Sequence, residues 1–328
     1  MTRLLLIRHG QTTSNVIRAL DTALPGASLT ALGWDQARAA GERIAVETGG
    51  TAPGMYLVSS LALRARQTAA GIVAGAASYG VDLNTTSPGS PFAGSLTGVP
   101  VVAGYGGLSR RNAGADLPEP VLTGDVGIPS DGMPSEEPTP EWTPAAVQDV
   151  PRLSGSPQRQ LPLIPPEAVP GAVPGISEIP AGRLEMRTDP EAHLVYHRTF
   201  ADWLGGALDL RVPGALNGRE VVGRYLSSLL PMLAAVRSVG SDLAVVSHGA
   251  VIRLVAGYLG RVDPGYAVRT DLANTARVEL EVPDSLTVPE LPTVDAPMLW
   301  TGDYLPEIVR EPWKVTDWAG LGEPPSLA

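Results

Sequence analysis

The stretch LLLIRHGQTTSN, residues 4–15, joins an apolar run to a cluster of polar and charged side chains. Its four apolar residues, Leu4 to Ile7, lead directly into Arg8, His9 and Gly10. A short apolar run that stops at a glycine is typical of a buried parallel strand. Ligands bind at the carboxyl ends of such strands in open α/β sheets. The stretch therefore predicts that an arginine and a histidine are placed together at the rim of a ligand site.

Composition narrows the class of protein. The chain has 328 residues, of which 44% are apolar, enough for a sizeable core. It has no cysteine, which excludes disulfides and thiolate metal sites and suits a reducing compartment. The net charge of −10 argues against a nucleic-acid binder, which needs a basic face. The run Leu4 to Ile7 is too short for a signal-peptide core, and 243–259 contains charged residues. We expect a soluble, cytoplasmic protein that binds neither nucleic acid nor membranes.

Hydrophobic patterns predict alternating strands and helices on both sides of a Pro-rich middle segment. The expected strands are 4–7, 55–58, 242–246 and 275–282. The expected helices are 31–46, 63–74, 191–208, 218–236 and 250–259, with Thr30 and Asn217 as N-caps. Alternation of this kind predicts an α/β domain with a largely parallel sheet.

The middle of the chain has a different composition. Residues 88–175 contain 17 Pro and 13 Gly, which predicts a low-complexity insertion that loops out of the domain and is disordered. The α/β domain is then discontinuous, covering 1–87 and 176–282, and 283–328 form an irregular Pro-rich tail. The Pro content of the insertion would suit a docking segment for a protein partner.

A second histidine follows a buried strand in the same way as the first, in Ser247-His248-Gly249. Because parallel strands end at the same edge of a sheet, we expect His9 and His248 to face each other. Two histidines with nearby arginines suggest phosphoryl chemistry, since guanidinium groups match phosphate oxygens. A neutral imidazole can attack phosphorus, and a protonated one can stabilise the charge that develops.

Three blocks together resemble the signature of the histidine phosphatase superfamily, also called the phosphoglycerate mutase-like family. The blocks are residues 4–15, SSLALRARQTA at 59–69, and SHG at 247–249. They occur in the family's order, each at the strand or helix position that the family requires. The resemblance covers 1–79 and 176–282 and implies a three-layer αβα sandwich with a mostly parallel central sheet.

This resemblance also implies residue roles. His9 would be the nucleophile that becomes phosphohistidine, and Arg8, Arg64, His248 and Asn15 would line the phosphate pocket. The residues themselves agree with this assignment. Flanking arginines should lower the pKa of His9, because like charges disfavour the imidazolium. A backbone carbonyl should hold one ring nitrogen of His9 as a donor and leave the other free to attack.

The proton donor is less directly indicated. The segments GISE at 175–178 and GRLE at 182–185 are similar to the family's region that carries an acidic residue. We assign Glu178 as general acid for the leaving group and as base for the water that follows. Glu185 is the competing assignment.

Another histidine pair, His193 and His197, lies at i, i+4 on the expected helix 191–208, a spacing that can hold a metal. No carboxylate motif accompanies the pair, so we interpret this segment as a surface helix. We expect no metal and no cofactor.

Three functions remain open at this point. The first is a metal-independent phosphatase that hydrolyses a small phosphorylated substrate through phospho-His9. The second is phosphoglycerate mutase-type transfer in the same pocket, and the third is a non-catalytic protein that binds a phosphorylated ligand or a partner. No long basic segment stands beside the core blocks to enclose a substrate, which favours hydrolysis over transfer.

Overall fold

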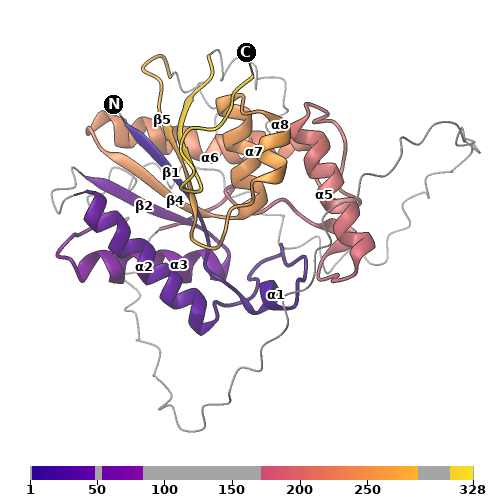
Figure 1. The fold of residues 1–328 in the computed structure, drawn as a ribbon, viewed down its shortest axis with the longest axis horizontal. Coiled ribbons are helices and arrows are strands. Elements are labelled where there is room, and N and C mark those ends of the chain that lie inside the picture. The colour runs from indigo at the N-terminus through magenta and orange to yellow at the C-terminus, as the bar shows by residue number, and fades with distance from the viewer. Residues whose placement is uncertain (1, 49–53, 84–170, 287–310, 328) are drawn as a thin grey trace, which may run out of the picture. The chain divides into compact units, whose positions relative to one another are not determined.

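The computed structural model of the chain describes residues 2–48, 54–83, 171–286 and 311–327 (Figure 1). The strands are β1 (Arg3–Arg8), β2 (Met55–Ser60), β3 (Ala172–Val173), β4 (Asp242–Ser247), β5 (Arg277–Glu281) and β6 (Lys314–Trp318). The helices are α1 (Thr13–Val16), α2 (Ala31–Glu47), α3 (Leu63–Ala77), a 3-10 turn (Gly182–Leu184), α5 (Pro190–Leu204), α6 (Gly218–Ser238), α7 (Gly249–Gly260) and α8 (Pro264–Arg269). No helix among the described residues combines the length and the apolar character needed to cross a membrane.

The strands form one sheet in the order β3-β2-β4-β1-β5-β6. Strands β3, β2, β4 and β1 are mutually parallel, and β5 runs antiparallel to β1. In the pairing of β1 with β4, Arg8 lies opposite Ser247. His9 and His248 therefore leave the sheet at neighbouring positions on the same edge.

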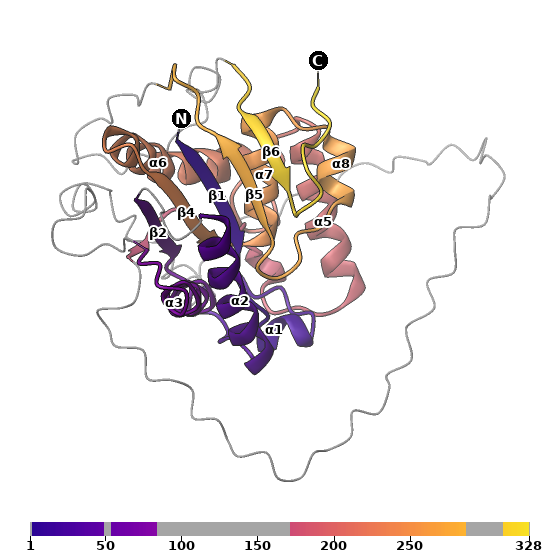
Figure 2. The same ribbon diagram turned by 60° about the vertical axis from the view of Figure 1, so that its left-hand side comes forward.

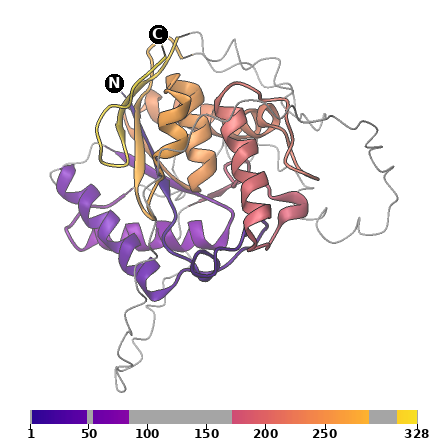
Figure 3. The ribbon, with the colours of Figure 1, turned by 45° about the vertical axis from the view of Figure 1, so that its right-hand side comes forward.

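Strand β1 contributes to both faces of the sheet. Leu4 and Leu6 pack into a core with α5, α6 and α7, whereas Leu5 and Ile7 pack into a second core with α2 and α3. This alternation follows from the two-residue period of a strand, in which successive side chains point to opposite faces. Helices α2 and α3 cover one face, and α5, α6 and α7 cover the other (Figures 1 and 3). The predicted αβα sandwich with a mostly parallel sheet is confirmed.

The sheet extends further than the sequence patterns predicted. Strand β3 lies within residues assigned to the insertion, and β6 lies within the tail that was expected to be irregular. Figure 2 shows β6 beside β5 at one edge of the sheet. β3 has only two residues, too few to show a period, and a register shift between Glu279 and Leu280 interrupts the pairing of β5 with β6. Trp313 and Trp318 of this segment are buried. Residues 84–170, most of the expected insertion, lie outside the described residues.

One helix also ends earlier than predicted. Helix α5 ends at Leu204 rather than at Leu208, because Gly205 and Gly206 follow and Gly206 has φ +99°. A positive φ is compatible with glycine and ends the helical conformation.

Candidate active site

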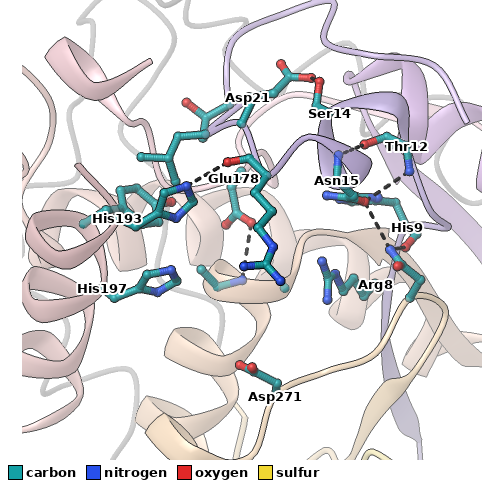
Figure 4. Close-up of a pocket in the computed structure, with 18 of the residues that line it drawn as sticks. Arg8, His9, Thr12, Ser14, Asn15, Asp21, Glu178, His193, His197 and Asp271 are labelled. Carbon is teal, nitrogen blue, oxygen red and sulfur yellow. Dashed lines mark hydrogen bonds between the residues drawn. The ribbon is translucent and has the colours of Figure 1, made fainter. Parts of the chain in front are cut away.

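The carboxyl ends of β1 and β4 open into a cavity of about 1030 Å³ (Figure 4). Its walls come from α1, from the loop before α2, from α5 and α7, and from the loop after α8. The predicted site residues that line the cavity are Arg8, His9, Asn15, Arg64 from α3, and Glu178 from the segment after β3. Chain segments far apart in sequence thus meet at the sheet edge where the two histidine motifs predicted a site.

His9 is held in one tautomer. Its Nδ1 lies 2.7 Å from the carbonyl oxygen of Gly10, which can only accept, so Nδ1 carries the proton and Nε2 is unprotonated. Burial lowers the pKa of His9 well below its ordinary value, and the positive charges of Arg64 and Arg8 lower it further. The neutral imidazole is therefore favoured, which agrees with the lowered pKa that the sequence analysis expected from the flanking arginines.

The backbone around His9 is also fixed. The N–H of His9 donates to the carbonyl of Ser247 at 3.0 Å, and its carbonyl accepts from Nδ2 of Asn274 at 3.0 Å. The next N–H, of Gly10, donates to Oγ1 of Thr68 at 2.9 Å. Asn274 and Thr68 were not assigned to the site, because nothing in their local sequence marks them as partners of a distant strand end.

His248 lies behind His9 rather than on the cavity wall. It is fully buried, and its ring packs edge to face on His9 with 5.3 Å between the ring centroids. Its Nδ1 accepts from Nε of Arg64 at 3.1 Å, so its proton is on Nε2, which donates to Oγ of Ser60 at 3.0 Å. Burial and Arg64 lower the pKa of His248 well below its ordinary value. His248 is not among the residues that line the cavity, and both of its ring nitrogens have partners, Arg64 and Ser60.

Two guanidinium groups keep unpartnered N–H donors beside His9. Arg64, in the first turn of α3, is 3% exposed, and its Nη1 has no hydrogen-bond partner among the described residues. Arg8 donates from Nη1 to the carbonyl of Leu272, while its buried Nε has no partner in the same set of residues. A buried unpaired donor costs about 1–3 kcal/mol, and more when charged. An anion with several acceptor oxygens would satisfy both groups.

The two candidate proton donors lie in different environments. Glu178 lines the cavity, and its carboxylate accepts from the N–H groups of Val251 at 2.9 Å and Ala250 at 3.3 Å, at the start of α7. Glu185 is not among the lining residues; its carboxylate accepts from the N–H of Thr22 at 2.7 Å and from the Thr22 hydroxyl, and Thr22 itself lines the cavity. This geometry favours Glu178 over Glu185.

Asn15 is held by a capping box at the start of α1. Its Oδ1 accepts from the N–H of Thr12 at 3.1 Å and from Nδ2 of Asn274 at 3.4 Å, and its own N–H donates to Oγ1 of Thr12. With the oxygen occupied in this way, the side-chain NH₂ group remains as a donor for the cavity.

His193 and His197, assigned to a surface helix, also line the cavity. Figure 4 shows them across the cavity from Arg8. Their rings are stacked with centroids 5.8 Å apart, and Nε2 of His193 lies 2.7 Å from the carbonyl oxygen of Arg18. The i, i+4 spacing places the two on one helix face, but it carries no information on what that face contacts. Among the described residues there is no group of three or more His, Cys, Asp or Glu able to hold a metal.

The remaining charged side chains of the lining were also missed by the sequence analysis. They are Arg18, Asp21, Arg253 and Asp271. Arg253 pairs with Asp271 at 2.8 Å and lies over the ring of Phe200 at 4.7 Å. Asp21 and Arg18 follow α1 in a loop that has no hydrophobic period, so nothing in the sequence indicated that they face the cavity.

A family model described as the histidine phosphatase superfamily (branch 1) matches residues 4–85 and 168–291. The chain belongs to the histidine phosphatase superfamily. The match includes all six predicted site residues, since Arg8, His9 and Asn15, then Arg64, and finally Glu178 and His248 fall within it. Membership supports a phosphatase or mutase-type enzyme.

The chain is also similar to known proteins in structure and in sequence. The solved structure of Mycobacterial hydrolase 1 superposes with a TM-score of 0.52 at 14% identity, covering 97% of this chain and 99% of that one. Mycobacterial hydrolase 2 gives 0.50 at 14% identity, covering 100% and 93%. At such identities these two histidine phosphatase folds show the architecture alone. The PE-PGRS family protein PE_PGRS11 of Mycobacterium tuberculosis is 44% identical over 64 residues, 20% of this chain. The match spans only 10% of the length of that protein.

Proposed function

We propose that this superfamily member is a metal-independent phosphatase that hydrolyses a small phosphomonoester through a phosphohistidine on His9. The observation that carries the proposal is the 2.7 Å contact between Nδ1 of His9 and the carbonyl of Gly10. This contact leaves Nε2 as the nucleophilic nitrogen of a neutral, buried imidazole. Arg8 and Arg64 both line the cavity, and each keeps a buried N–H donor without a partner among the described residues.

In the first step, Nε2 of His9 attacks phosphorus, and the P–N bond forms as the bond to the ester oxygen breaks. Arg8, Arg64 and the NH₂ group of Asn15 bind the non-bridging oxygens. Glu178, in its protonated form, gives its proton to the leaving oxygen, so an alcohol departs. His248 acts as a positioning residue that supports the His9 ring and orients Arg64.

In the second step, a water molecule attacks the phosphohistidine. Glu178, now a carboxylate, accepts a proton from the water as the new P–O bond forms and the P–N bond breaks. Inorganic phosphate is released and neutral His9 is regenerated. The cavity extends well beyond the phosphate end, to α5 and the loop after α8, which leaves room for the alcohol portion of the substrate.

The test is a panel of phosphomonoesters assayed in EDTA with the full chain and with His9→Ala. We expect turnover in EDTA, an acid-labile phosphoenzyme in the wild type, and neither in His9→Ala. Full activity of His9→Ala would contradict the proposal. Incubating 3-phosphoglycerate with and without bisphosphoglycerate separates hydrolysis from mutase-type transfer, because only a mutase moves the phosphoryl group to a second position.

We further propose that the Pro-rich insertion serves as a docking segment for a protein partner and is not required for catalysis. Its composition is the support for this proposal, since Pro-rich segments present preformed extended conformations to partners. Deleting residues 91–170 tests it. Unchanged turnover agrees with a docking role, whereas lost turnover would assign the segment to the active site.

A further inference from the structure

An acidic side chain lies against one arginine of the cavity. Oδ2 of Asp21 is 3.9 Å from Nη1 of Arg64, and the two side chains are only 8% and 3% exposed. Asp21 also lines the cavity and comes from the loop that follows α1 (Figure 4). If Arg64 binds the phosphate, as the proposed function requires, the phosphate lies within reach of this carboxylate. Like charges repel strongly where water is excluded.

The position of the Asp21 carboxylate is fixed by hydrogen bonds. Its Oδ2 accepts from Oγ of Ser14 at 2.8 Å and from the N–H of Ala27 at 2.8 Å. None of the described residues donates a hydrogen bond to Oδ1. Asp21 therefore presents a negative charge whose place is set by α1 and by the loop before α2, independently of any ligand.

The contact with Arg64 is an electrostatic one and not a hydrogen-bonded pair. At 3.9 Å the two groups are too far apart for a hydrogen bond, and Nη1 of Arg64 has no partner within the described part of the chain. The loop approaches Nη1 so closely that a Cβ on Gly26 would lie 2.2 Å from it. The loop thus holds the carboxylate beside Arg64 without forming a hydrogen bond to its Nη1.

We propose that Asp21 is a counter-charge that weakens the binding of dianionic phosphate and so promotes release of the product. This inference rests on the proposed function. Two buried arginines with unpartnered donors would otherwise bind inorganic phosphate as readily as substrate. Catalysis gains only from interactions that are stronger in the transition state than in the ground state. In a loose transition state the transferred group is metaphosphate-like, with less negative charge than the bound dianion, so Asp21 penalises the dianion more.

The test is binding of inorganic phosphate to the full chain, measured by calorimetry, in the wild type and in Asp21→Asn. We expect the variant to bind phosphate about tenfold more tightly or better, because it loses the like charge. Its kcat and KM for an aryl phosphate should fall together, which is the signature of lost ground-state destabilisation. Asp21→Ser, which also lacks the charge and can still accept hydrogen bonds, should behave in the same way.

Two control variants separate the effect of losing the Asp21 charge from the effect of disturbing the local structure. Asp209→Asn removes the same formal charge from a surface pair with Arg219, away from the cavity lining, and should leave phosphate affinity unchanged. Ser14→Ala removes one hydrogen bond to Oδ2 of Asp21 and keeps the charge, so phosphate binding should stay near the wild-type value.

The outcomes distinguish this inference from the proposed function. If the wild type binds phosphate and both Asp21 variants bind it equally or more weakly, the inference is wrong and the proposed function stands. If the wild type neither binds phosphate nor hydrolyses any ester of the panel, both are wrong. Tighter phosphate binding in both Asp21 variants, with Asp209→Asn unchanged, supports the inference.

Discussion

Arg64 donates from Nε to Nδ1 of His248 across 3.1 Å, and this bond sets the tautomer of the imidazole that packs against His9. With Nδ1 accepting, His248 must donate from Nε2, and Ser60 receives that proton at 3.0 Å. One chain of contacts therefore joins the first turn of α3, the start of α7 and the end of β2. His248 supports His9 as a neutral ring and leaves the positive charge of the site to the arginines.

Replacing Ser60 tests this arrangement. Ser60→Ala removes the acceptor of a buried N–H, so we expect the free energy of unfolding to fall by about 1–3 kcal/mol. Ser59→Ala is the matched control, because the neighbouring hydroxyl is equally buried and has no hydrogen-bond partner within the described residues. Chemical denaturation measures both variants. Equal losses of stability in the two would contradict a stabilising hydrogen bond between His248 and Ser60.

The lowered pKa values of His9 and His248 predict how stability depends on pH. Both histidines are neutral in the folded chain, whereas in the unfolded chain they take up protons below the ordinary value of 6.5. The unfolded state then binds more protons, so stability is complete above pH 6.5 and falls as the pH drops below it. The slope approaches about 1.4 kcal/mol per pH unit for each histidine.

Denaturation of the wild type and of His9→Asn at several pH values between 7.5 and 5 measures this slope. The variant lacks one of the two groups and should lose less stability per pH unit. A slope that is the same in both chains would show that His9 is not held neutral by the fold.

Replacing Glu178 and replacing Glu185 should change kcat in different ways, because only Glu178 is proposed to protonate the leaving group. Glu178→Gln removes the group proposed to protonate the leaving oxygen, so we expect kcat to fall by about 10²–10⁴-fold for alkyl phosphates. Aryl phosphates should lose much less, because their leaving groups need no proton. Glu185→Gln disturbs the hydrogen bonds to Thr22 and should affect both substrates equally. A leaving-group dependence in Glu185→Gln instead would reverse the assignment.

A substitution at Gly26 tests whether the position of the Arg64 guanidinium determines substrate binding. Gly26 has φ +71°, and a Cβ there would lie 2.2 Å from Nη1 of Arg64. Gly26→Ala should therefore displace the guanidinium and raise KM, in addition to a backbone cost of about 1–2 kcal/mol. Gly80→Ala is the control, since Gly80 has φ +73° and nothing within 4 Å of its Cβ position. It should lose similar stability with an unchanged KM.

The parts of the fold predicted from sequence are those that local pattern determines. Strands β1 and β4 are continuous apolar runs, and Thr30 and Asn217 cap α2 and α6 as expected. The small elements β3 and β6 were missed because their pairing partners lie far away in the chain. A two-residue strand gains its structure from β2, not from its own sequence.

The residues of the candidate site also fall into those that the sequence predicted and those that it did not. Arg8 and His9 were predictable because they come at the end of a buried strand, whereas Arg64 was assigned from the resemblance of residues 59–69 to the family's second block. Asp21 and Asn274 come from loops, and their contacts arise only when separate segments meet. The position of His248 depends on the direction in which its ring points, which a motif at a strand end does not specify.

Strand β1 lies between two hydrophobic cores, and its last backbone bond joins the N–H of His9 to Ser247. Breaking that bond requires β1 and β4 to separate, which exposes both cores. The amide of His9 should therefore exchange its hydrogen only through global opening of the domain, whereas amides around Asp21 can exchange through local fluctuations. The proposed nucleophile is therefore expected to lie in the part of the structure that opens last, and the proposed counter-charge Asp21 in a loop that can open by itself.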